Sequence, residues 1–376
     1  MNMGTEIPSS GQTERIDQVE AIKLLKQAPL GELMHLAYTE RMRRHPNQLV
    51  TFVFDTNPNY TNICVTRCRF CAFCRQPDDA DAYTLTPAEV GDKVRKASAM
   101  GATTVLLQGG HNPKVGLARW LEYISAIQDA APGIHIHPFS PAEYLFMAQT
   151  EQCDVVDVLE AVYGAGVRTI PGGGAEILTE SVRRQIAPRK ADTDQWLAVC
   201  EAAHHVGFRT TATMMFGHVE SDEDIVEHLL VLRQLQDKTG GFTSFIPWSY
   251  KPGDNPLGKQ VTRSAHPAKY VRIIALARLV LDNFAHIQSS WFSENVAAGQ
   301  MGLLAGADDF GGILVEENVH KEAGHARSTT EDTVKTIIRR AGFTPAQRDS
   351  FYNVLQTFEG PDIPGISSEV DQASGQ

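Results

Sequence analysis

Four of the six cysteines in this 376-residue chain lie within one eleven-residue stretch, at Cys64, Cys68, Cys71 and Cys74. The first three have the spacing C-x3-C-x2-C, and the aromatic Phe70 precedes the third. Three thiolates on one short loop can hold three irons of a [4Fe–4S] cluster and leave the fourth iron open to a substrate or a cofactor. An open iron indicates chemistry at the metal centre instead of electron storage alone.

The same four cysteines have two other interpretations. Together they could close a structural zinc site or a fully ligated electron-transfer cluster. Zinc ribbons usually pair two C-x2-C knuckles that are a dozen or more residues apart, whereas these cysteines all lie in one stretch. The spacing therefore favours the open cluster with Cys64, Cys68 and Cys71 as ligands. Cys74 is not assigned as a ligand, because it could equally be an inert neighbour, a spare ligand or a site of oxidation.

Composition narrows the class of protein. The formal net charge of -11 provides no extended basic surface for a nucleic-acid backbone, so we expect no nucleic-acid partner. No stretch of the chain approaches the length of a membrane span. Six cysteines, two of them isolated at Cys153 and Cys200, make a poor disulfide framework, and residues 1–14 lack the order of a secretory signal. We therefore predict a cytoplasmic protein.

The elements that must position the cysteines follow a βα rhythm. Short apolar or β-branched runs alternate with helical patterns, and the runs begin near Leu49, Thr103, Ile134, Val167, Arg209, Phe242, Ile287 and Asp308. Eight such units predict a parallel (βα)8 barrel of the TIM type. Thr86 and Ser221 provide capping signals at the starts of two of the intervening helices.

The remaining segments are extensions of this barrel. Residues 15–46 have a helical pattern and are expected to cap the bottom of the barrel. Residues 331–355 are predicted to form one or two packed helices, interrupted at Gly342 and Pro345. We expect one domain over residues 15–357, between disordered ends at 1–14 and 358–376.

In a parallel barrel the functional groups gather at the carboxyl ends of the strands. Chemically active residue types follow several of the predicted strands, and they are Asp55, Asn57, Gln108, Gly109, Gly110, His111, His137, Ser140, Glu176, His218, Glu220, Trp248, Ser290, Trp291, Glu316 and Glu317. Adjacent glycines allow a backbone to approach a ligand closely. Aromatic rings beside hydroxyls and carboxylates suit a substrate that contains a flat ring and a sugar.

The cysteine motif resembles the signature of the radical S-adenosylmethionine superfamily. That resemblance implies that the open iron chelates the methionine part of S-adenosylmethionine and that Phe70 lies near the adenine. Gly109 and Gly110 match a GGE motif that contacts the cofactor, although His111 replaces the glutamate. The cofactor site further includes Ser140, Glu176 for the ribose hydroxyls, and Met215. Residues 213–220 resemble the GxIxGxxE motif on the adenine side, with Thr213 in place of its first glycine.

Residues 211–220 and 240–248 resemble the menaquinone-pathway branch of this superfamily, most of all the cyclic dehypoxanthine futalosine synthases. The resemblance implies that a reducing electron donor such as flavodoxin or ferredoxin supplies an electron. A 5′-deoxyadenosyl radical then abstracts the ribose C4′ hydrogen of dehypoxanthine futalosine, and the substrate closes a ring onto its benzoate. His218 and Glu220 are the predicted proton-handling residues, and Arg75 and Arg168 are possible partners of the benzoate.

Three alternatives remain open at this point. Aminofutalosine synthase and the F420 side-ring synthases belong to the same superfamily and share the cluster. The third alternative belongs to another class, a non-catalytic iron–sulfur or zinc protein that uses all four cysteines.

Overall fold

The computed structural model describes residues 15–291, 293–315, 318, 322, 324 and 329–360. Most residues of the two predicted disordered ends, together with Glu316 and Glu317, lie outside the described residues. The strands of the described part are β1 (Leu49–Thr56), β2 (Thr104–Leu107), β3 (His135–Pro138), β4 (Thr169–Ile170), β5 (Arg209–Phe216), β6 (Phe242–Ser249), β7 (His286–Ile287), β8 (Asp309–Leu314), β9 (Thr344–Arg348) and β10 (Val354–Thr357).

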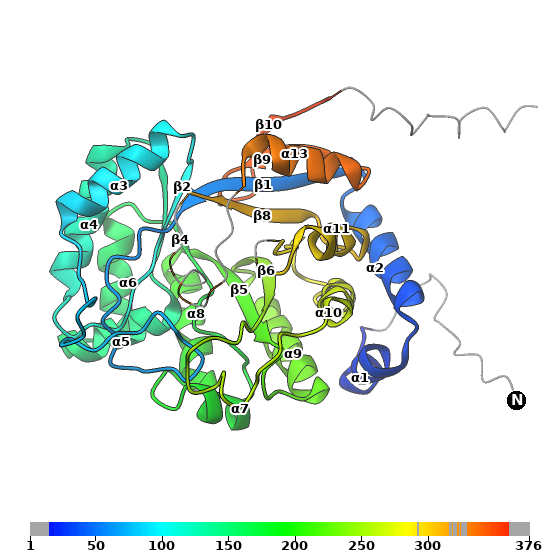
Figure 1. Ribbon diagram of the computed structural model, residues 1–376, viewed down its shortest axis with the longest axis horizontal. Coiled ribbons are helices and arrows are strands. Elements are labelled where there is room, and N and C mark those ends of the chain that lie inside the picture. The colour runs from blue at the N-terminus through cyan, green and yellow to red at the C-terminus, as the bar shows by residue number, and fades with distance from the viewer. Residues whose placement is uncertain are drawn as a thin grey trace, which may run out of the picture.

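The first eight strands form a curled parallel barrel, as the sequence predicts (Figure 1). β8, β1, β2 and β3 are paired in one sheet, and β4 to β7 are paired in a second sheet. An isolated bridge between Gln288 and Asp309 joins the two sheets on one side. On the other side, His135 and His137 of β3 both hydrogen-bond to Thr169 of β4. Every predicted strand start lies within two residues of an observed one.

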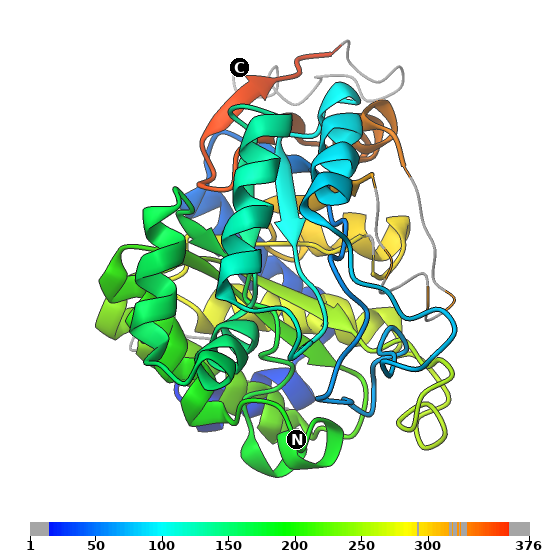
Figure 2. The same cartoon turned by 90° about the vertical axis from the view of Figure 1, so that its left-hand side faces the viewer.

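Helices cover the outside of the strands, and Figure 2 shows several of them in front of the sheet. They are α1 (Gln18–Gln27), α2 (Leu30–Arg44), α3 (Pro87–Ala99), α4 (Leu117–Ala130), α5 (Pro141–Glu151), α6 (Val155–Gly164), α7 (Glu180–Ile186), α8 (Thr193–Val206), α9 (Asp222–Thr239), α10 (Pro267–Val280), α11 (Val296–Leu304) and α13 (Glu331–Arg340). Both predicted capping signals are confirmed, because Thr86 and Ser221 each form a capping box with the residue three positions later.

The apolar core lies between these helices and the strands. It divides into two clusters, one centred on α3 to α6 with β2 and β3, and one centred on α9 to α11 with β5 and β6. Trp120 and Trp196 are almost completely buried in these two layers. Burial of such large side chains fixes the outer helices, so the strand ends that carry the polar residues are held on a rigid frame.

The N-terminal helices lie mainly along the side of the barrel. α2 packs on α10, and α1 packs on α9 and α10. The C-terminal end of α2 lies at the bottom, the end at which the strands begin. There the buried Arg41 guanidinium donates to the carbonyl oxygens of Leu49 and Ala307, at 3.0 and 2.9 Å.

The C-terminal extension differs from the prediction. α13 is present, but the second half of the segment forms a hairpin, in which β9 pairs parallel to β1 and antiparallel to β10. Pro345 therefore belongs to a strand that pairs with Val50, and it does not interrupt a helix. Residues 348–352 close the bottom of the barrel, where Ser350 contacts Thr104 of β2 and Tyr352 stacks on His286 of β7. The helical pattern failed here because an alternation over only five residues is too short to distinguish a strand.

Among the described residues, no helix combines the length and the apolar character that crossing a lipid bilayer requires.

Candidate active site

A cavity of about 450 Å³ occupies the barrel interior and opens at the carboxyl ends of the strands. This volume suits a small organic ligand. We name two groups among the residues that line this cavity. We call the first the cofactor rim, and it comprises Cys64, Cys68, Phe70, Cys71, Gly109, Gly110, His111, Ser140, Glu176 and Lys190. We call the second the C-terminal floor, and it comprises Asp55, Arg348, Ser350 and Tyr352.

The cysteine loop is held by backbone hydrogen bonds. The Cys64 amide donates to the Arg75 carbonyl at 3.1 Å, and the Arg69 amide donates to the Ile186 carbonyl at 2.8 Å. Among the described residues, no three cysteine sulfurs lie within 4.8 Å of one another. A single tetrahedral zinc ion would hold its sulfurs about 3.8 Å apart, given zinc–sulfur bonds of about 2.3 Å. In the part of the chain that the structure describes, the loop therefore does not present a preformed tetrahedral zinc site.

The protonation state of the cysteine thiols affects how the cluster assembles. Burial raises the pKa of the Cys68 thiol to about 12, and burial also raises the pKa of Cys71. These thiols are therefore neutral before metal binds, and cluster assembly must displace their protons. Cys74 also lines the cavity, and its thiol donates to the Cys64 carbonyl oxygen at 3.2 Å. This contact fixes the place of Cys74 in the loop, and the three-cysteine assignment stays a prediction.

The paired glycines bring backbone close to the cysteine loop. A Cβ atom at Gly110 would lie 2.2 Å from the Ile63 carbonyl oxygen, so only glycine fits there. The Gly109 amide donates to the buried Glu143 carboxylate at 3.1 Å, and Tyr60 and Ser140 donate to the same carboxylate. Glu143, which the sequence analysis did not identify, thus stabilises the glycine turn by accepting this hydrogen bond.

His111 lies beside these glycines and is electrically neutral. Its Nδ1 is 2.7 Å from the Thr66 hydroxyl, and its ring stacks on Phe146 at 4.7 Å between centroids. Burial lowers the pKa of His111 to about 3, so the imidazole carries no proton charge at neutral pH. It differs from the glutamate of the GGE motif in charge as well as in shape.

The backbone of Glu176 is strained, and an ion pair holds its side chain in place. Its backbone has a φ of 46°, in the left-handed region that non-glycine residues seldom adopt. Its carboxylate accepts a hydrogen bond from the Lys190 ammonium at 2.8 Å. The Lys190 ammonium lies 5.9 Å from the centre of the Phe70 ring, so the cation faces the same part of the cavity as the cysteine loop. Lys190 had no signal in the sequence, because it follows a helix and no predicted strand end.

Met215, His218 and Glu220 do not line the cavity. The Met215 side chain is fully buried, and its amide donates to the Glu176 carbonyl at 2.6 Å. The Glu220 carboxylate accepts from the amides of Gly217 and His218, both at 2.7 Å, and pairs with Lys269 at 2.9 Å. These contacts hold the loop after β5, and they place the two predicted proton-handling side chains away from the cavity.

The C-terminal floor lies deeper in the barrel. Arg348 donates to both carboxylate oxygens of Asp309, at 2.5 and 3.1 Å, and the Thr51 hydroxyl donates to the same carboxylate. Arg75 and Arg168, the two cations considered for a substrate carboxylate, are outside this cavity. The cations that line it are Lys190 and Arg348, which lie at opposite ends.

Aromatic side chains form part of the wall between rim and floor. Trp248, Trp291 and Phe310 line the cavity, and the rings of Trp291 and Phe310 stack at 6.1 Å. Gln108, Thr211 and other hydroxyl or amide groups lie among them. The wall can therefore contact a flat ring and hydroxyl groups in one ligand.

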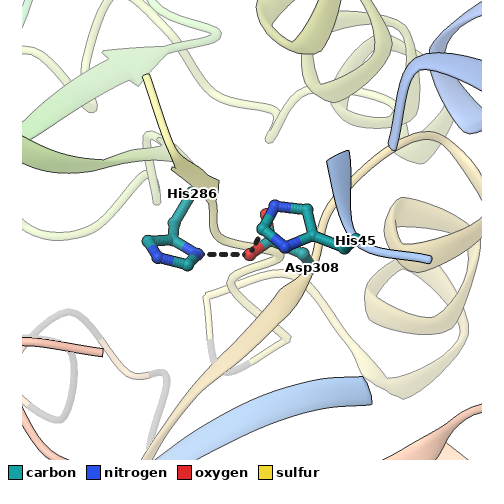
Figure 3. A group of neighbouring side chains, drawn as sticks. All are labelled: His45, His286 and Asp308. Carbon is teal, nitrogen blue, oxygen red and sulfur yellow. Dashed lines mark hydrogen bonds and ion pairs between the residues drawn. The ribbon is translucent and has the colours of Figure 1, made fainter. Parts of the chain in front are cut away.

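A second group of ionisable side chains, His45, His286 and Asp308, lies near the bottom of the barrel (Figure 3). Asp308 accepts from His286 at 2.6 Å and pairs with the Arg278 guanidinium through its other oxygen. The Nε2 of His45 is 3.0 Å from the Ala285 carbonyl oxygen, which requires a proton on that nitrogen. A buried guanidinium and occupied ring nitrogens make this a structural ion-pair network that is unsuited to a cation.

Two family models match the chain. Residues 58–232 match the radical SAM superfamily, and residues 239–360 match the CofH/MqnC C-terminal region. A 5-amino-6-(D-ribitylamino)uracil–L-tyrosine 4-hydroxyphenyl transferase from Methanopyrus kandleri is 40% identical over 87% of this chain and 90% of its own. A cyclic dehypoxanthine futalosine synthase from Halalkalibacterium halodurans is 37% identical over 92% of this chain and 93% of its own.

Solved structures show the same fold at low identity. Methylornithine synthase (PylB) superposes with a TM-score of 0.70 at 17% identity, over 89% of this chain and 95% of its own. The FeFe-hydrogenase maturase HydG from Carboxydothermus hydrogenoformans has a TM-score of 0.70 at 18% identity, over 90% of this chain and 78% of its own. With the cysteine loop, the glycine turn and both family matches in place, the chain belongs to the radical SAM superfamily, whose enzymes use a [4Fe–4S] cluster and S-adenosylmethionine.

Proposed function

We propose that this enzyme converts dehypoxanthine futalosine into its cyclic product in menaquinone biosynthesis. The observation that carries the proposal is the continuity of the cavity. It joins the cysteine loop at the rim to aromatic and hydroxyl-bearing walls below, so one ligand can reach from the cofactor to the floor. Residues 211–220 and 240–248, which resemble the cyclic dehypoxanthine futalosine synthases, supply Thr211, Thr213, Ile246 and Trp248 to that wall.

Cys64, Cys68 and Cys71 would hold the cluster, which with S-adenosylmethionine would supply the radical chemistry for removal of a hydrogen atom from ribose C4′. The other residues act by position. Glu176 offers acceptors to a ribose, and the backbone of Gly109 and Gly110 lies beside the cysteine loop. The aromatic wall excludes water and holds the benzoate against C4′, which favours ring closure over side reactions. The closed ring regains its aromaticity by losing one proton to solvent and one electron to a one-electron acceptor, a role that the oxidised cluster would fill.

The second candidate is transfer of a 4-hydroxyphenyl group to 5-amino-6-(D-ribitylamino)uracil. The observation in its favour is the 40% identity to the Methanopyrus kandleri transferase, which is higher than the 37% identity to the synthase from Halalkalibacterium halodurans. Both candidate substrates combine a flat ring with a chain of hydroxyls, so the composition of the wall suits each of them. For either reaction we infer a one-electron reductant such as flavodoxin or ferredoxin as partner.

The test is a comparison of the two substrates on one enzyme preparation. The cluster is reconstituted anaerobically, reduced, and supplied with S-adenosylmethionine and either dehypoxanthine futalosine or the ribitylaminouracil with tyrosine. Mass spectrometry then measures 5′-deoxyadenosine and each expected product. We expect the cyclised product from the first substrate. Formation of the aryl-transfer product alone would replace the proposal with the second candidate, and neither product from an intact cluster would reject both.

A further inference from the structure

Asp55 occupies a position in the cavity that the proposed reaction has not yet used. Along β1, the alternate residues Val53, Asp55 and Asn57 line the cavity, as the period of two in a strand requires. Asp55 is paired in register with Thr104 of β2 and with Leu314 of β8. Because Thr104 also contacts Ser350, the Asp55 carboxyl lies at the level of the C-terminal floor.

Among the described residues, the Asp55 Oδ1 atom has no hydrogen-bond partner, although the residue is only 6% exposed. An unpaired buried carboxyl oxygen is costly to a folded protein and is usually retained for a function. Gly312 makes room for this group, since a Cβ atom there would lie 2.5 Å from Oδ1. The sequence therefore leaves space for a carboxyl without providing it with a partner.

The neighbouring cation does not satisfy Asp55. Arg348 directs its guanidinium at Asp309, whose oxygens also accept from Thr51 and the Gly311 amide. In its ionised form Asp55 would repel an anionic part of a ligand, and this guanidinium is already engaged by Asp309. A neutral donor such as a hydroxyl group would instead interact favourably with Asp55, because it can donate a hydrogen bond directly to the carboxylate.

We propose that Asp55 binds the substrate by accepting a hydrogen bond from a hydroxyl of its sugar, or of its open-chain polyol, at the C-terminal floor. This inference rests on the proposed function for the identity of the ligand. It adds a residue that neither the cysteine motif nor the cofactor motifs include. Asn57, Thr104 and Thr211 also line the cavity, and they supply further hydroxyl and amide groups for a polyhydroxylated ligand.

The proposal predicts a dependence on pH. Burial raises the pKa of Asp55 to about 8, so its carboxyl is largely protonated at pH 7. Substrate binding must then release a proton, and affinity rises with pH through this range. The charged and titratable groups that face Asp55 are Arg348 and Asp309, with Tyr352 and His137 on the surrounding elements. Burial keeps the pKa of His137 well below and that of Tyr352 well above this range, and Arg348 stays charged.

The experiment compares Asp55→Asn with wild type as the cluster-loaded enzyme, and it uses Asp129→Asn on the exposed face of α4 as the matched control. Cluster content and S-adenosylmethionine binding are measured first. Steady-state KM for dehypoxanthine futalosine is then measured from pH 6.5 to 8.5. We expect Asp55→Asn to raise KM by about 10- to 100-fold, the loss of a hydrogen bond to a charged group, with a smaller change in kcat. Asp129→Asn should behave as wild type.

Wild type provides a second test that does not depend on the variant folding. Its KM should fall about 25-fold between pH 6.5 and 8.5, and this slope should be absent in Asp55→Asn. Turnover by wild type with a KM that is unchanged by the substitution, or with the same slope in both proteins, would overturn the role of Asp55 and leave the proposed function intact. Absence of turnover by wild type would instead reject the proposed function, and the same measurements would then be made with the ribitylaminouracil substrate.

Discussion

The cofactor rim and the C-terminal floor face the same cavity, but they are built in different ways. The rim depends on short local motifs, in which three cysteines or two glycines lie within a few residues of one another. The floor joins Asp55 of β1 to Arg348, Ser350 and Tyr352 at the other end of the chain, through the pairing of β9 with β1. The family matches divide in a related way, since residues 344–357 lie in the CofH/MqnC C-terminal region and the cysteines lie in the radical SAM region. This difference agrees with our proposal that the rim carries the chemistry common to the superfamily and that the floor contacts the substrate.

The largest expected effect comes from the rim. Cys64→Ala, Cys68→Ala or Cys71→Ala should each abolish cluster-dependent cleavage of S-adenosylmethionine, because each removes one of three ligands. Cys74→Ala should retain most of its iron and sulfide. Iron and sulfide analysis with a 5′-deoxyadenosine assay measures both. Cluster loss in Cys74→Ala equal to that in the other three variants would show that four cysteines act as ligands.

The next effect concerns the stability of the floor. Arg348→Met should lower the free energy of unfolding by about 3–5 kcal/mol, because it leaves the buried Asp309 carboxylate without its cation. Urea denaturation followed by circular dichroism measures this change. Arg184→Met, which removes an exposed pair with Glu180, is the control and should change the free energy by less than about 1 kcal/mol. Equal effects would mean that the buried pair of Arg348 and Asp309 stabilises the protein no more than the exposed pair of Arg184 and Glu180.

The buried Asp55 should also make stability depend on pH in the absence of any ligand. Its pKa is raised from 3.8 to about 8 in the folded state, so the folded protein holds this proton when the unfolded chain has lost it. Stability contributed by the proton is present below about pH 4 and is lost as pH rises to about 8. Relative to Asp55→Asn, wild type should therefore lose roughly 5 kcal/mol of unfolding free energy over that range. Parallel pH profiles would show that Asp55 titrates normally.

The smallest effect is expected for the ribose contact at the rim. Glu176→Gln should weaken S-adenosylmethionine binding about tenfold, because a charged acceptor of a hydroxyl hydrogen bond is lost. Equilibrium dialysis with the cluster-loaded protein measures the affinity, and Glu180→Gln at the start of α7 serves as the control. An affinity equal to that of wild type would mean that Glu176 does not bind S-adenosylmethionine and serves only in the ion pair with Lys190.

The barrel and most of the rim could be predicted from the sequence, because periodicity and close spacing are local properties. The eight strand starts, the two helix caps and the cavity-lining cysteines and glycines are examples. The floor could not be predicted, since a five-residue strand containing Pro345 has no clear period and its pairing with β1 is a property of the folded chain. The sequence analysis did not identify Lys190 for a similar reason, because its contact with Glu176 forms only when the loop around Glu176 is folded.

His218 and Glu220 illustrate the opposite difficulty. Their position after β5 predicted that they would face the substrate, but a strand end fixes only where the backbone leaves the barrel. The side chains turn away and hydrogen-bond to the backbone of their own loop. Motif position therefore identified the loop correctly without indicating which of its atoms are available to a ligand.

The central claim is that the sugar of the substrate lies between the cofactor rim and Asp55, with its C4′ presented to the cofactor. The most direct measurement uses dehypoxanthine futalosine that carries deuterium at C4′, with the reduced holoenzyme and S-adenosylmethionine. Mass spectrometry should find that deuterium in the 5′-deoxyadenosine produced by wild type. Unlabelled 5′-deoxyadenosine formed alongside the cyclised product would contradict the account, because the hydrogen atom would then have come from elsewhere.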